Sequence, residues 1–211
     1  MKYYLEIFHK YCYTNNEVNH MNGFEIRREN KMNDILNAAL KLFSMYGIKK
    51  VSIAEIAKSA NVSQVSIYNF FESKENLARQ AFFKIMDDIM SDMEALVESN
   101  LTFKEKVKKM HFISTNSSNT FNEIFNQIDF IKDPLIQKFL DEYGENKTIP
   151  LLMQLIEQGK LEGDLDSDIS SESILIYIHA VNKALQSNIN KKVRSDLGKL
   201  FYYGIFGSNT K

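Results

Sequence analysis

The stretch Gln64 to Phe71 combines two apolar side chains with several groups that form hydrogen bonds. Ile67 and Phe71 are four positions apart, so on a helix they share one face and point toward a core. A helix of this length makes about two turns, and its outward face carries amide, hydroxyl, aromatic and small apolar groups. These outward residues are Gln64, Val65, Ser66, Tyr68 and Asn69. Amides and hydroxyls both donate and accept hydrogen bonds, so this face suits a DNA groove.

Two helix starts, one directly after the other, would position this face. Ser52 is a good N-cap and Glu55 follows three residues later, which predicts a capping box. Ser63 caps the next helix, and an apolar residue precedes each cap as in a hydrophobic staple. Asn61 tolerates the left-handed conformation that the tight turn between the helices needs. The pattern predicts a helix-turn-helix.

Further helices are expected on both sides of this motif. Apolar residues at helical spacing predict one from Ile35, which ends at Gly47 as a C′ glycine. Ser73 caps a long helix that runs to about Glu98, a length of about 35 Å at 1.5 Å per residue. Such a helix is long enough to join two domains.

The chain resembles the TetR family of bacterial transcriptional repressors. The opening helix ILNAALKLFSMYGI, the unit SIAEIAKSANVS and the runs IYNFF and SKENL follow the family's order and spacing over about a quarter of the chain. Asn61 stands where the family usually has glycine, and Val65 where a small residue or proline is commoner. The resemblance implies an all-α fold, in which an N-terminal three-helix helix-turn-helix DNA-binding domain is joined by a long helix to a helical ligand-binding and dimerisation domain.

The resemblance also implies roles for individual residues, because the second helix of the motif lies in the major groove in this family. Gln64 and Asn69 can pair with adenine, and Val65 can touch a thymine methyl group. Tyr68 and Lys74 are expected to contact phosphate, as are the Ser52 side chain and the backbone at Ile53. The predicted DNA-binding set is Ser52, Ile53, Ser63, Gln64, Val65, Ser66, Tyr68, Asn69 and Lys74. For each of them, the alternative is an ordinary surface residue.

Composition and charge agree with a regulator that binds DNA at one end. The 211 residues are 44% apolar and 25% charged, enough for a full core. The stretch Arg27 to Arg79 holds nine of the 26 Lys/Arg and five of the 27 Asp/Glu, a net charge of +4, and the rest of the chain carries −5. A basic end attracts phosphate. No apolar run reaches the roughly 18 residues of a membrane helix and no signal peptide is recognisable, so a cytoplasmic protein without membrane contact is expected.

The residues that most often perform chemistry are not arranged for it. The single cysteine, Cys12, excludes an internal disulfide, and His9, Cys12 and His20 do not match a zinc spacing. The sequence has no glycine-rich phosphate loop, no G-x-S-x-G and no nucleophile–base signature. We therefore expect a binding protein rather than an enzyme, with no metal and no cofactor.

Three regions are predicted along the chain: residues 1–26, 27–76 and 77–211. The first is rich in aromatic residues and is predicted to be a poorly anchored extension. The alternatives are an extra docking segment and an upstream translation start, with Met21 or Met32 the true one. The second is the DNA-binding domain and the third the effector-binding and dimerisation domain. Beyond the long helix, further helices are predicted over 103–112, 121–130, 134–159 with a kink near Gly144 and Pro150, 171–189 and 193–206.

The third region offers candidates for an effector pocket and for a subunit interface. Methionine and aromatic side chains predict a pocket for a small apolar or aromatic effector, the alternative being ordinary core packing. The candidate pocket residues are Met110, His111, Phe121, Phe125, Met153 and Tyr177. Two-fold pairing of the last two helices would form a four-helix bundle and set two recognition helices about 34 Å apart. The candidate interface residues are Ile174, Ile178, Val181, Leu185, Leu197 and Phe201.

The sequence thus predicts a homodimeric repressor that binds a palindromic double-stranded DNA operator and is released by a small-molecule effector. Two alternatives stay open: a helix-turn-helix regulator without a small-molecule inducer, and an all-α ligand-binding protein that has lost DNA binding. The intact set of Ser52, Ser63, Tyr68 and Lys74 argues against such a loss.

Overall fold

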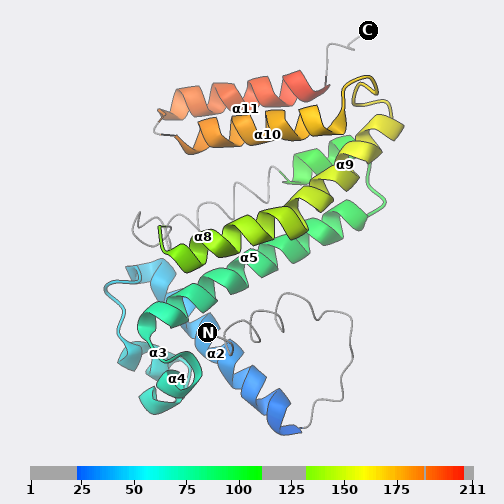
Figure 1. Ribbon diagram of the computed structural model, residues 1–211. Coiled ribbons are helices and arrows are strands. Elements are labelled where there is room, and N and C mark those ends of the chain that lie inside the picture. The colour runs from blue at the N-terminus through cyan, green and yellow to red at the C-terminus, as the bar shows by residue number, and fades with distance from the viewer. Residues whose placement is uncertain (1–22, 111–131, 188, 207–211) are drawn as a thin grey trace.

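The computed structural model describes residues 23–110, 132–187 and 189–206, and every regular element in these ranges is helical (Figure 1). The predicted all-α fold is confirmed. The elements are α2 (Gly23–Tyr46), α3 (Ile53–Ser59), α4 (Gln64–Phe71), α5 (Lys74–Glu98), α8 (Pro134–Tyr143), a π-helical turn (Gly144–Thr148), α9 (Ile149–Leu161), α10 (Ser171–Gln186) and α11 (Lys191–Phe206). Residues 103–110 are also helical. In Figure 1, α2, α3 and α4 form one end of the molecule, α5 and α8 run beside each other, and α10 and α11 lie at the other end.

The predicted N-caps of the first short helices are confirmed. Ser52 accepts the Glu55 backbone N–H at 3.2 Å, and Glu55 in turn accepts the Ser52 backbone N–H at 2.7 Å, which completes the capping box. The Ser63 hydroxyl accepts the backbone N–H of the residue three positions on, and the Ser73 hydroxyl does the same. Asn61 adopts the left-handed conformation with φ 53°. Local side chains thus define the ends of α3, α4 and α5.

Helix α2 ends as predicted but begins early. Gly47 has φ 79°, and its backbone N–H donates to the Phe43 carbonyl at 2.8 Å. At its other end α2 begins at Gly23, ahead of the domain boundary that the sequence predicted at residue 27. The first turn of α2 is therefore continuous with the part of the helix that contributes Met32 and Ile35 to the core.

One hydrophobic core runs from the helix-turn-helix into the next part of the chain. Ile35, Phe43, Ile56 and Phe71 are buried in it, and Phe82 of α5 joins the same cluster. From α8 the cluster receives Ile136, Phe139 and Tyr143. The Phe139 ring lies 4.2 Å from that of Phe83 and 6.0 Å from that of Phe82, centroid to centroid. A single packed core therefore connects α4 to α8 through α5.

A second, smaller core lies around α9 and α10. Phe103, Leu155, Ile156, Leu165 and Ile174 are its buried members. The turn after α9 brings Leu165 back against the helix that precedes it, with Gly163 at φ 76°. This core holds the start of α10 in place.

The long helix predicted over 134–159 is interrupted where the kink was expected. A π-helical turn, Gly144–Thr148, separates α8 from α9, and Pro150 stands in the first turn of α9. A π turn and a proline both disturb the regular ladder of hydrogen bonds. The sequence therefore located this break correctly.

Two predicted boundaries shift and several predictions lie outside the described residues. Helix α10 ends at Gln186 rather than near residue 189, because Ser187 is extended and its hydroxyl donates to the Ala184 carbonyl at 2.6 Å. Helix α11 begins at Lys191. The helix expected over 121–130 and the first 22 residues, with His9, Cys12 and His20, lie outside the described ranges. Within those ranges no helix has the length and hydropathy needed to cross a membrane.

Candidate nucleic-acid interface

Helix α4 presents an outward face that the core leaves free. Ile67 and Phe71 are each 1% exposed, whereas Val65 is 67% and Tyr68 50% exposed. Gln64 and Asn69 are also exposed. The predicted division between inward and outward residues is therefore correct for these positions. Among the outward residues, amide and phenol groups are available for hydrogen bonds with a partner.

Ser66 differs from its predicted neighbours on that face. Its hydroxyl lies 2.9 Å from the hydroxyl of Ser63, the N-cap of α4, and its side chain is half-buried. Ser66 therefore contributes to the local geometry of the helix start. A hydroxyl has one donor and two acceptor positions, so capping leaves further hydrogen-bonding capacity.

The start of α5 reaches back to the start of α3. The Lys74 ammonium group donates to the carbonyl of Lys49, in the turn before α3, at 3.3 Å. Ser52 is exposed there, while the side chain of Ile53 is buried, which leaves only the backbone of Ile53 as a candidate contact. Hydrogen bonds from the Ser52 hydroxyl and backbone, and then the charge of Lys74, hold the pKa of Glu55 below its usual value. A cation and a helix N-terminus thus lie close together, which favours an anion.

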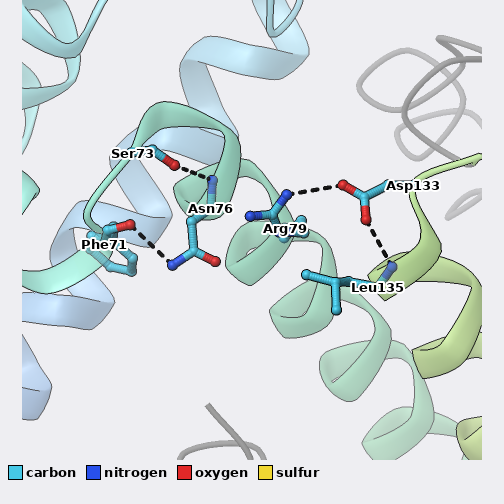
Figure 2. A network of polar contacts seen from close by, with 6 residues as sticks. All are labelled: Phe71, Ser73, Asn76, Arg79, Asp133 and Leu135. Atoms are coloured by element: carbon cyan, nitrogen blue, oxygen red, sulfur yellow. Dashed lines mark hydrogen bonds and ion pairs between the residues drawn. The ribbon is translucent and has the colours of Figure 1, made fainter. Parts of the chain in front are cut away.

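The link between α4 and α5 is strained and tightly held. Glu72, the C-cap of α4, has φ 63° and ψ −41°, a conformation that residues with a side chain rarely adopt. The buried side chain of Asn76 donates from Nδ2 to the carbonyl of Phe71 at 3.0 Å (Figure 2). The backbone N–H of Ser73 donates to the same carbonyl. The end of α4 is therefore fixed to the first turn of α5.

One turn further along α5, an ion pair reaches α8. Arg79 Nη1 donates to Asp133 Oδ2 at 2.9 Å, and Asp133 Oδ1 accepts the Leu135 backbone N–H at 2.8 Å as the N-cap of α8 (Figure 2). Arg79 Nε is buried and has no hydrogen-bond partner among the described residues. This ion pair was not predicted. Asp133 followed by Pro134 is a recognisable helix start in the sequence. The ion pair of Asp133 with Arg79, 54 positions earlier, is visible only in the folded chain.

The structure describes only half of the predicted effector pocket. Met110 is half-buried and packs against the second core, and Met153 is half-buried in α9. Tyr177 is 40% exposed and its ring stacks on Phe201 of α11, with the centroids 5.9 Å apart. Tyr177 therefore faces α11. His111, Phe121 and Phe125 lie outside the described residues.

The four predicted interface residues of α10 share one side of that helix, and the other two lie on α11. Ile174 is buried in the second core of its own chain, and Ile178 packs against that core, so this pair does not present the apolar surface that the sequence suggested. Val181, Leu185, Leu197 and Phe201 are half-buried. The most exposed large apolar residues of the two helices are Ile176, Tyr177, Val193 and Leu200. Helical spacing reveals two apolar sides of α10 without indicating which one meets the core.

Comparison with known proteins points to one family. The family model described as bacterial regulatory proteins, tetR family, matches residues 35–81. The uncharacterised HTH-type transcriptional regulator YhgD of Bacillus subtilis is 28% identical over 132 residues, 61% of this chain and 69% of that protein. The HTH-type transcriptional repressor KstR2 of Rhodococcus jostii is 23% identical over 150 residues, 69% of this chain and 72% of that protein.

Solved structures share the fold. A transcriptional regulator from Cytophaga hutchinsonii superposes with a TM-score of 0.68 at 19% identity, over 82% of this chain and 93% of that one. The transcriptional regulator FadR from Bacillus subtilis, in complex with stearoyl-CoA, superposes with a TM-score of 0.56 at 19% identity, over 82% and 98%. These likenesses extend beyond the helix-turn-helix to the helices that follow it.

Proposed function

The chain belongs to the tetR family of bacterial regulatory proteins, DNA-binding transcriptional regulators rather than enzymes, and we propose that it is a homodimeric repressor of a palindromic operator. In this proposal a small apolar or aromatic effector releases it from DNA. It would act in the cytoplasm, where the operator is. The relative KstR2 is a transcriptional repressor, which supports repression rather than activation as the proposed role.

The observation that carries the proposal is the outward face of α4, together with the cation beside the start of α3. Gln64 and Asn69 are exposed amides, and such groups pair with adenine in the major groove. Val65 is exposed beside them and can touch a thymine methyl group. Lys74, one turn from the α4 C-terminus, donates to the Lys49 carbonyl just before α3 and its charge acts on Glu55 in the first turn of α3, so phosphate can be held there while α4 meets base edges.

Operator recognition is tested with DNA selected from a random pool by the full chain. Gln64→Ala and Asn69→Ala are expected to change the selected sequence, and each costs about 1–3 kcal/mol if the amide binds its base in a bidentate manner. Lys74→Ala should weaken binding to every sequence and flatten the slope of log affinity against log salt, by about 0.9 if Lys74 neutralises one phosphate.

Tyr68→Phe helps to distinguish base contacts from charged phosphate contacts, because it removes a hydroxyl without removing charge. It should weaken binding to all sequences and leave the salt slope unchanged. The assignment of Gln64 and Asn69 fails if their variants select the wild-type sequence with wild-type affinity. A full chain that enriches no sequence would overturn the function itself.

Dimerisation is proposed through the exposed apolar side of α10 and α11. Ile176 and Leu200 are each 64% exposed, and the exposed residue Val193 lies on the same pair of helices. Two copies that join these helices about a two-fold axis would form a four-helix bundle and cover these side chains. Half-buried Val181, Leu185, Leu197 and Phe201 remain candidates for the edge of that interface.

The effector is proposed to bind in the helical part beyond α5. Met110, Met153 and Tyr177 are its described candidates, and FadR, which shares the fold, was crystallised with stearoyl-CoA. A hundredfold loss of operator affinity requires about 2.7 kcal/mol of differential binding between two states of the protein. Burial of a few additional apolar groups is enough to provide it.

A thermal-shift screen with acyl-CoA thioesters and small aromatic compounds tests this part. A ligand that raises the melting temperature should also release the labelled operator, and Met153→Trp should prevent the release or imitate it. Ligands that stabilise the chain without changing DNA affinity would contradict release by an effector. A regulator without an inducer would then be the better description.

A further inference from the structure

The first turns of α2 carry a basic strip that lies before the stretch matched by the family model. Arg27, Arg28 and Lys31 are all exposed. At 100° per residue these three positions fall within an arc of about 100° on the helix, whereas Glu25 and Glu29 fall on another side. The three basic residues form no ion pair with a carboxylate in the described part of the chain. Their charge is therefore available to a partner.

One member of the strip touches the helix that carries the predicted base contacts. The Arg28 guanidinium lies over the ring of Phe70 in α4, 5.3 Å from its centroid. This cation–π contact uses the face of the guanidinium, so the N–H groups at its edge can still donate to a phosphate. The start of α2 lies at the same end of the molecule as α3 and α4 (Figure 1). Arg28 thus places a positive charge beside α4.

Arg28 lies on the Phe70 side of α4, away from Tyr68. On the helix, Phe70 and Tyr68 flank the outward positions Val65 and Asn69 from opposite sides. A helix in the major groove has a phosphate backbone on each side, and the groove is about 12 Å wide. Tyr68 can serve one backbone, and a cation over Phe70 is placed to serve the other.

We propose that Arg27, Arg28 and Lys31 form a second phosphate-binding element, which takes backbone phosphates of the operator duplex on the Phe70 side of α4. The proposal rests on the proposed DNA-binding function. In it, Arg28 is a positioning residue whose fork of donors matches a phosphate, and Arg27 and Lys31 follow the same backbone. None of the three reads a base.

The test measures operator affinity from 50 to 300 mM salt by fluorescence anisotropy, with the full chain and a duplex selected by the wild type. Arg28→Ala and the double variant Arg27→Ala/Lys31→Ala should weaken binding several-fold at low salt, to the selected and to a scrambled duplex alike. The slope of log affinity against log salt should fall by about 0.9 for each phosphate that the variant no longer neutralises. Lys41→Ala is the matched control, because it removes one exposed charge from the same helix ten residues beyond Lys31, about 15 Å along its axis.

The outcomes separate the two proposals. If both strip variants keep the wild-type affinity and slope while Lys74→Ala does not, the strip is a solvated surface and this inference is wrong. An effect of Lys41→Ala equal to that of Arg28→Ala would also overturn it, because net charge would explain both. If circular dichroism shows that Arg28→Ala disturbs the fold, the double variant tests the strip in its place, because it leaves the Arg28–Phe70 contact intact. A wild type that selects no duplex overturns the proposed function and, with it, this inference.

Discussion

Gly159 allows the second core to close, because any side chain there would collide with it. A Cβ atom at this position would lie 2.8 Å from Leu165 Cδ1 and 3.0 Å from Phe103 Cδ2, and both of these side chains are buried. Leu165 and Phe103 would have to shift within the core around α9 to make room for it. The glycine is therefore required for packing and not for its backbone freedom.

Overpacking in Gly159→Ala should cost about 1–3 kcal/mol. The helix-propensity gain of about 1 kcal/mol for replacing glycine by alanine offsets part of this cost, so the free energy of unfolding should fall by up to about 2 kcal/mol. Urea denaturation measures the change. Gly144→Ala is the control, since nothing lies within 4 Å of a Cβ there, and it should not destabilise the chain. Equal stability of Gly159→Ala and the wild type would show that the Leu165 side chain moves aside at little cost.

Asp87 is a carboxylate held between α5 and the end of α8. The Tyr143 hydroxyl lies 3.0 Å from Asp87 Oδ1, and the Lys147 ammonium group lies 3.7 Å from it. Burial nevertheless raises the pKa of Asp87 above its usual value, because desolvation outweighs both partners. The folded state therefore binds a proton more tightly here than the unfolded state does.

The contribution of Asp87 to stability should be fully present below the ordinary carboxyl pKa of about 4 and should be lost as the pH rises through the raised folded value. Asp87→Asn cannot titrate, so from acidic to neutral pH its free energy of unfolding should fall less than that of the wild type. Urea denaturation at several pH values provides the comparison. Asp88→Asn removes a neighbouring negative charge that adds to the rise in the pKa of Asp87, so it should flatten the profile less than Asp87→Asn does. Parallel profiles for Asp87→Asn and the wild type would contradict the assignment.

At the scale of elements, α5 connects the helix that meets DNA with the helices beyond it. Asn76 holds the last carbonyl of α4, and Arg79, one turn later on the same face of α5, holds the N-cap of α8 (Figure 2). The Phe82 and Phe83 rings continue this connection to Phe139. A change in the position of α8 would therefore move α5 and, with it, α4.

The Arg79–Asp133 pair should be energetically coupled. A double-mutant cycle of Arg79→Gln and Asp133→Asn is expected to give an interaction energy of about 0.5–3 kcal/mol in chemical denaturation. Both side chains are at most a quarter exposed, which limits screening by solvent. If α5 transmits motion, each single variant should also change operator affinity. Lys138→Gln on α8, which breaks an exposed ion pair within that helix, should not. If the two substitutions change the free energy of unfolding additively, Arg79 and Asp133 are not coupled.

At the scale of the whole molecule, charge and apolar surface are separated. The outward face of α4 and the basic residues around it lie at one end, and the exposed apolar residues of α10 and α11 lie at the other (Figure 1). A dimer joined at α10 and α11 leaves both copies of α4 free. This arrangement fits a palindrome read by two identical helices.

Ile176→Asp and Leu200→Asp should dissociate the proposed dimer without unfolding the chain, because both residues are exposed in one copy and a charge buried between copies is costly. Sedimentation at micromolar concentration, with circular dichroism, measures both effects. Ile174→Asp is the contrasting variant: it places the charge in the second core and should lower the melting temperature. A wild-type monomer, or variants that remain dimeric, would show that this surface is not the interface.

The sequence alone determined the local structure around α3, α4 and the start of α5. Ser52 with Glu55, Ser63, Ser73 and Asn61 act through hydrogen bonds and backbone conformations that span only a few residues, so their types and spacing were sufficient. The inward positions of Ile67 and Phe71 followed from helical periodicity in the same way, and so did the outward face of α4.

Only the tertiary structure decided which elements meet. The contacts of Lys74 with Lys49 and of Arg28 with Phe70 join residues far apart in the chain, and no local pattern announces them. The same holds for Ile174, which periodicity assigned to a subunit interface and packing assigned to the second core. Periodicity identifies an apolar side of a helix, but the partner of that side depends on how the whole chain packs.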